Sequence, residues 1–70
     1  MSFSKALRML RIENDISLNE LARNVNIDVS TLSRYESTPM KPSAEYFKRI
    51  ADYFHMSSDD LYKMCDELDA

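Results

Sequence analysis

The strongest constraint on the fold is a pair of helix-start signals that lie only eleven residues apart. Ser17 precedes Glu20 by three residues, which is the capping-box pattern at the start of a helix. Asp28 stands before a second apolar-periodic segment, which we expect to form a helix over residues 29–37. Asn26 lies between the two segments, where a left-handed residue commonly ends a helix. The spacing therefore predicts two short helices joined by a turn of three or four residues.

Three further helices are expected around this pair. The first covers about residues 4–13, and Ser43 caps the fourth. The inner stripe of the fourth helix consists of Phe47, Ile50, Ala51 and Phe54. Ser57 with Asp60 forms another capping-box pair and opens the fifth. Since no segment shows the alternation typical of strands, we predict an all-α, compact five-helix fold in a single domain over residues 1–70.

Length and composition exclude several classes of protein. Seventy residues, 44% hydrophobic and 30% charged, suit one small globular domain without a separate deep active site. His55 and Cys65 stand alone, without metal-ligand spacing or a nucleophile–base arrangement. The chain has no glycine, and therefore no glycine-rich loop for a phosphate. We expect no enzymatic activity, no metal, no cofactor and no small-molecule ligand.

Cysteine usage and hydropathy indicate a compartment. One cysteine cannot form an internal disulfide, which is typical of a reducing environment. No apolar run approaches the roughly 20 residues that a membrane span requires, and no signal-peptide pattern is present. The sequence thus predicts a cytoplasmic protein with no membrane partner.

The net charge of −3 is unevenly distributed along the chain. Residues 58–70 hold five acidic residues and one lysine, a net charge of −4, so residues 1–57 carry +1. Most of the acidity therefore lies in a C-terminal segment, and the body is near neutral with local basic positions. This is less basic than a DNA-binding domain usually is, and it favours a protein partner over DNA.

Residues 17–36 read SLNELARNVNIDVSTLSRYE. This segment resembles the helix-turn-helix of the phage Cro and lambda-repressor-like (XRE) family. The likeness continues with LRMLR at residues 7–11, PS at residues 42–43 and FHMSSDDL at residues 54–61. The resemblance implies a lambda-repressor-like DNA-binding domain whose second and third helices form the helix-turn-helix, followed by a C-terminal helix and acidic tail at residues 58–70.

Four positions depart from the family pattern. Glycine is favoured where this chain has Asn26, Thr38 and His55. Asparagine and histidine tolerate left-handed geometry, whereas Thr38 predicts a remodelled loop beside Pro39. The family's glutamine at the start of the second helix, which usually contacts a DNA phosphate, is Leu18 here.

The resemblance carries the base-reading role to Val29, Ser30, Ser33 and Arg34. In the family's docking mode these positions enter the major groove, which is about 12 Å wide. Val29 would contact a thymine methyl group, the serines suit either base type, and Arg34 suits a bidentate contact to guanine. The alternative interpretation is that these residues are a solvated helix face.

Phosphate anchoring would come from the start of the second helix, the loop after the third helix and the start of the fourth. The residues concerned are Ser17, Asn19, Thr38, Lys41 and Ser43. Each is also an ordinary cap or loop residue. Arg23 is interpreted as a surface charge with a secondary phosphate role.

A structural ion pair is implied between Arg11 and Glu36. In the family such a pair joins the first helix to the end of the third and fixes the angle of the recognition helix. Removal of one partner from a partly buried pair strands the other charge, at a cost of a few kcal/mol.

The fifth helix carries apolar residues that suggest a dimer seam at Met64, Cys65 and Leu68, with Leu61 in the core. The alternative is a longer helix that folds back on its own domain. A dimer would place two recognition helices about 34 Å apart, one turn of DNA.

Together these observations predict sequence-specific binding to double-stranded operator DNA by a small Cro-like homodimer of phage or bacterial type, which regulates transcription as a repressor. The competing hypothesis is a protein-binding module on the same scaffold, an antitoxin-like protein or a phage inhibitor, with weak or no DNA binding. Leu18 and the acidic balance favour the second hypothesis, and the face of the third helix favours the first.

Overall fold

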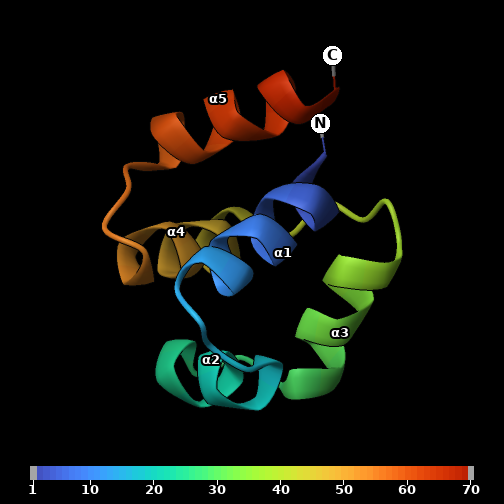
Figure 1. Ribbon diagram of the computed structural model, residues 1–70, viewed down its shortest axis with the longest axis vertical. Coiled ribbons are helices and arrows are strands. Elements are labelled where there is room, and N and C mark those ends of the chain that lie inside the picture. Colours follow the sequence, from blue (N-terminus) through green and yellow to red (C-terminus); the bar gives the residue numbers. More distant parts are fainter. Residues whose placement is uncertain (1, 70) are drawn as a thin grey trace.

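The computed structural model describes residues 2–69 and contains five helices, with no strand in that range (Figure 1). The helices are α1 (Phe3–Glu13), α2 (Leu18–Val25), α3 (Val29–Ser37), α4 (Ala44–Tyr53) and α5 (Ser58–Asp69). The predicted all-α, five-helix fold is confirmed. Among the described residues, no helix is long and apolar enough to cross a membrane.

Serine and aspartate side chains cap four of the five helices. The hydroxyls of Ser17, Ser43 and Ser57 each accept the backbone N–H three residues later, at 3.0–3.2 Å. The Asp28 carboxylate accepts the backbone N–H of Ser30 at 3.2 Å. Each cap satisfies a helix-end donor that has no partner within the helix, and is worth about 1 kcal/mol. The four boundaries predicted from capping signals are therefore set by local chemistry.

Three non-glycine residues adopt left-handed backbone conformations where one helix ends and the chain turns to the next. Asp15 has φ 51°, Asn26 has φ 56° and His55 has φ 59°. Thr38 instead is extended, with φ −131°. Two of the three positions where the family favours glycine thus keep the left-handed turn, and the third is rebuilt as an extended step into the Pro39 loop.

The core is organised around α1, which lies between α5 on one side and α2 with α3 on the other (Figure 1). Its inner face buries Phe3, Ala6, Leu7 and Leu10. The ring of Phe3 meets Tyr35 of α3 edge-on at 5.7 Å and lies 5.6 Å from Phe47 of α4. Tyr62 of α5 stacks on Phe47 at 4.1 Å. This aromatic chain connects four helices and fixes the platform from which α3 projects.

Candidate nucleic-acid interface

The turn between α2 and α3 is held rigidly by one buried side chain. Ile27 is 4% exposed, and its backbone N–H donates to the carbonyl of Ala22 at 3.1 Å. On α3, Leu32 and Tyr35 are buried. Because two turns of this helix face inward through these residues, its remaining side is directed to solvent.

The four residues predicted to read bases all lie on this solvent side of α3. Val29 is 38% exposed, and Ser30, Ser33 and Arg34 are also exposed. The side chains of Ser33 and Arg34 make no hydrogen bond or ion pair with any residue that the structure describes. We call these four residues the α3 outward face. Its chemistry combines a small apolar group, two hydroxyls and a guanidinium, which is a set that matches base edges in a major groove.

At the start of this face, Asp28 engages Ser30 twice. The carboxylate accepts the backbone N–H of Ser30 and also its hydroxyl proton. The hydrogen bond from the Ser30 side chain, with the backbone N–H groups of Ser30 and Thr31, lowers the pKa of Asp28. While this bond persists, the Ser30 oxygen presents lone pairs outward and its proton is occupied.

The predicted phosphate contacts are all exposed, but their hydrogen-bonding capacity differs. Ser17 and Ser43 accept bonds from helix amides, so their hydroxyl protons are available to a phosphate. Thr38 donates its proton to the carbonyl of Arg34 at 2.7 Å, so it has none to offer. Asn19 and Lys41 make no side-chain bond to the described residues. Four of these five side chains can therefore donate to an anion.

Leu18 occupies the first position of α2, where the family has a polar residue. Its side chain is half-buried and packs against the hydrophobic core. The start of α2 consequently lacks one side-chain donor, and any phosphate bound there would depend on the backbone N–H groups and their neighbours Ser17 and Asn19.

The angle of α3 is fixed by a bidentate ion pair with α1. Arg11 Nε lies 2.6 Å from Glu36 Oε2, and Nη2 donates to Oε1 at 3.0 Å. A third donor, Nη1, bonds to the carbonyl of Ile16 at 3.1 Å. The Glu36 side chain is only 10% exposed. Its hydrogen bond raises the pKa of Arg11, so the guanidinium keeps its positive charge.

Two further contacts that support the helix-turn-helix were not predicted from the sequence. Arg8 donates to the backbone carbonyl of Glu36 at 3.0 Å and so adds a second link between α1 and α3. Arg49 of α4 donates to the carbonyl of Asn26 at 3.0 Å, while its guanidinium lies 5.2 Å from the centre of the Tyr46 ring. In the sequence, the one indication of the Arg8 contact is that Arg8 lies three residues before Arg11 on the same helix.

The predicted dimer seam requires one correction. Cys65 is 0% exposed and belongs to the monomer's core, so its side chain does not lie on a surface seam. Burial raises the pKa of the Cys65 thiol to about 11, which keeps it neutral. The prediction for Cys65 was wrong because apolar residues at positions i, i+3, i+4 and i+7 are equally typical of a helix face buried in the core and of a helix face at a dimer seam. Met64 and Leu68 are partly buried against the same core.

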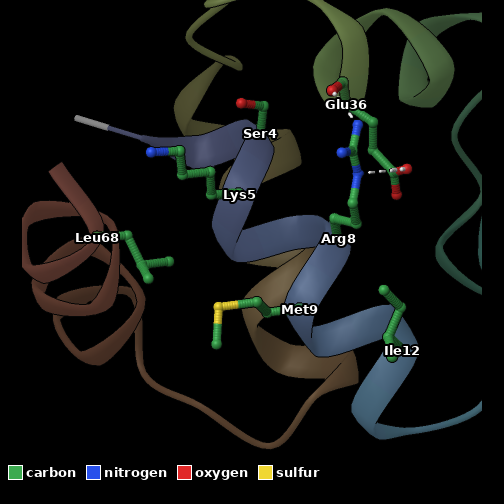
Figure 2. Close-up of a pocket in the computed structure, with 7 residues that line it drawn as sticks. All are labelled: Ser4, Lys5, Arg8, Met9, Ile12, Glu36 and Leu68. Carbon is green, nitrogen blue, oxygen red and sulfur yellow. Dashed lines mark hydrogen bonds and ion pairs between the residues drawn. The ribbon is translucent and has the colours of Figure 1, made fainter.

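No group of three histidine, cysteine, aspartate or glutamate side chains within residues 2–69 is arranged to hold a metal ion. An open groove of about 390 Å³ runs along α1, bordered by Leu68 of α5 and by Glu36 of α3 (Figure 2). It lies apart from the α3 outward face.

Comparison with known proteins gives three results. A helix-turn-helix family model matches residues 7–61. The uncharacterized HTH-type transcriptional regulator YvzC of Bacillus subtilis (strain 168) is 31% identical over 51 residues, which are 73% of this chain and 66% of that protein. The crystal structure of the clp gene regulator ClgR from Corynebacterium glutamicum superposes with a TM-score of 0.83 at 23% identity. That superposition covers 94% of this chain and 70% of ClgR, and it supports the fold alone.

Proposed function

The chain belongs to the XRE-type helix-turn-helix family, and from this premise we propose that it binds double-stranded DNA in a sequence-specific manner and regulates transcription. In this proposal α3 enters the major groove, and the protein acts as a homodimeric, Cro-like repressor on operator DNA. The B. subtilis relative bears the name of a transcriptional regulator, which supports the same class of activity.

One observation carries the proposal: the α3 outward face is exposed, and the side chains of Ser33 and Arg34 have no partner among the described residues, although the helix beneath them is firmly anchored. Arg34 has no ion pair among the described residues, and a free guanidinium at this position suits the O6 and N7 acceptors of guanine. The Arg11–Glu36 pair holds the helix at one angle, which lowers the entropic cost of docking.

Electrostatics limit the strength of binding. With nine lysine and arginine residues against twelve acids, few cations are available to displace counterions. Arg11 is moreover committed to Glu36. We therefore propose that the affinity for DNA depends only weakly on salt concentration and comes largely from base contacts.

The test is selection from a random duplex library at two salt concentrations, with the mass of the protein measured in solution. Enrichment of a palindromic site and a dimer mass are expected. Binding to every duplex without preference, or no binding at low salt, would contradict the proposal.

A second candidate is a protein-binding module on the same scaffold, antitoxin-like or a phage inhibitor. Leu18 replaces a polar anchor with a half-buried apolar side chain, and the net charge of −3 repels phosphate. If no duplex is enriched in the selection, this candidate becomes the preferred function.

A further inference from the structure

The side of α1 that faces away from the core is apolar at its centre. Met9 is 40% exposed and Ile12 is 66% exposed, and within the described residues no other helix exposes two large aliphatic side chains. Both line the groove of Figure 2, where Leu68 of α5 faces Met9 across the gap. Lys5 and Arg8 line the N-terminal part of the same groove. An uncovered apolar centre of this kind marks an interaction surface.

The exposed residues of α1 form ordered rows. Lys5, Met9 and Glu13 are spaced by four and therefore lie along one ridge of the helix, and Arg8 with Ile12 forms the neighbouring ridge. The first ridge runs from a cation through a methionine to an anion. Neither Lys5 nor Glu13 has an ion-pair partner among residues 2–69. We call these five residues the α1 outer face.

This order of charges is self-complementary under a two-fold rotation. If a second helix of the same sequence crosses in the opposite direction with Met9 at the centre, its two ends exchange places. Lys5 then lies opposite Glu13 of the partner subunit, and the same pair forms again at the other end. Ridges spaced by four residues pack into each other's grooves, which is the commonest mode of helix contact.

We propose that a second copy of this chain docks antiparallel on the α1 outer face, with Met9 at the two-fold axis. The inference rests on the homodimer of the proposed function and specifies where that dimer forms. Leu68 continues the apolar surface from α5, so part of the predicted seam is retained. No residue of the α3 outward face lines this groove, and both copies keep that face free.

Charge distinguishes a second copy from other occupants. DNA is repelled because α5, which borders the groove, carries a net charge of −4. An acidic peptide from another protein would satisfy Lys5 and Arg8 but would meet Glu13 and the acids of α5. Only a partner with a cation at one end and an anion at the other matches both ends of the ridge, and this chain supplies such a partner.

The size of the surface sets the expected affinity. A standard interface buries about 800 Å² per partner, nearly a fifth of the 4425 Å² surface of this chain. A helix of eleven residues is about 16 Å long and provides less than that. The dimer is therefore expected to be concentration-dependent, with a dissociation constant of about 10–100 µM in the absence of DNA.

The first test is sedimentation equilibrium of the full chain from about 5 to 500 µM, a range that brackets this constant. Met9→Lys places two like charges at the axis and should weaken association at least about tenfold. Met40→Lys is the matched control, because Met40 is 37% exposed in the loop before α4 and should leave association unchanged. Circular dichroism checks that both variants keep the wild-type fold.

The second test is a charge exchange. Lys5→Glu and Glu13→Lys should each weaken association about fivefold, because every dimer contains the pair twice. The double variant restores opposite charges at both ends and should return to within about twofold of wild type. A chain that stays monomeric at all concentrations, a dimer indifferent to Met9→Lys, or a double variant without recovery would overturn the proposal.

Binding to a duplex that contains a single half-site separates this inference from the proposed function. A monomer suffices for that duplex, so Met9→Lys should bind it as wild type does while failing to dimerise. A wild-type chain that binds the half-site but stays monomeric at all concentrations overturns the docking face alone. Absence of half-site binding by the wild-type chain overturns the proposed function and leaves the association result standing.

Discussion

Two exposed helix faces of this molecule differ in chemistry although both are open to solvent. The α3 outward face carries two hydroxyls and an unpaired guanidinium around one small apolar residue, Val29. The α1 outer face carries Met9 and Ile12 between charges of opposite sign. Exposure is similar at Val29 and Met9, 38% and 40%. The pattern of polar groups, and not the exposure of the apolar residue, is therefore the basis on which we propose a different ligand for each face.

The two faces also depend on each other mechanically. α1 supplies Arg8 and Arg11, which bind the end of α3. Arg11 lies outside both faces, whereas Arg8 is also a member of the α1 outer face. A change that disturbs these contacts should alter the direction of α3, whereas a change at the other residues of either face should leave the fold intact. The predictions that follow separate these cases.

The largest effect is expected from Glu36→Ala. This change strands the guanidinium of Arg11 and should lower the free energy of unfolding by about 3 kcal/mol. Chemical denaturation of both proteins measures the difference. Glu67→Ala on α5 is the control, since Glu67 is exposed and has no pairing partner among the described residues, and should change stability by less than about 0.5 kcal/mol. Equal stability of Glu36→Ala and wild type would show that the pair does not anchor α3.

Arg34→Ala tests the α3 outward face directly. Loss of a bidentate base contact should weaken binding to the preferred half-site by about 2 kcal/mol and relax the preference at one base position. Lys5→Ala removes the same charge from the α1 outer face and is expected to leave half-site binding within about 0.5 kcal/mol of wild type. Titration of labelled duplexes with each single base substitution measures both effects. A uniform loss across all duplexes would assign Arg34 to phosphate.

How far the sequence alone leads can be judged from particular residues. Ser17, Asp28 and Ser43 use short-range hydrogen bonds, so their capping roles follow from neighbours three or fewer residues away. The cap at Asp28 predicts a helix that begins at Val29, and α3 begins there; its end was predicted only as about Ser37. The residues of the α3 outward face were expected from the family resemblance, and the burial of Leu32 and Tyr35 on the opposite side is consistent with their exposure.

Residues whose role depends on distant segments were harder to predict. Arg8 and Arg49 reach backbone carbonyls that lie more than twenty positions away in the chain, and no periodic signal marks such a contact. Cys65 was placed on a seam because sequence does not reveal whether α5 packs on α1 or extends beyond it. The exposed Ile12 was missed because only the packed fold shows which side of α1 remains uncovered.

A smaller effect is expected at the turn that aims α3. Asn26 has φ 56°, a left-handed conformation that asparagine tolerates better than alanine does. Asn26→Ala should therefore lower the free energy of unfolding by about 1 kcal/mol. Asn26→Gly should be within a few tenths of a kcal/mol of wild type. Asn19→Ala, on the exposed side of α2, is the control and should not destabilise. Thermal melts compare the four proteins, and equal melting of the alanine and glycine variants would contradict the argument.

The smallest effect concerns the hydroxyl at the start of the α3 outward face. The Ser30 hydrogen bond lowers the pKa of Asp28, so its stabilising contribution is present above the ordinary value of 3.8 and is lost as pH falls through the lower native value. The stability advantage of wild type over Asp28→Asn should therefore shrink as pH falls below about 4.

Ser30→Ala removes the main cause of the lowered pKa and should move the titration midpoint of the Asp28 carboxyl carbon, followed by NMR, toward the ordinary value. The same midpoint in Ser33→Ala should stay at the wild-type position, because Ser33 does not contact Asp28. If Ser30→Ala leaves the midpoint unmoved, the Ser30 proton is not held by Asp28. The α3 outward face would then present a freely rotating hydroxyl in place of a fixed hydrogen-bond acceptor, and Ser30 would discriminate less between base edges.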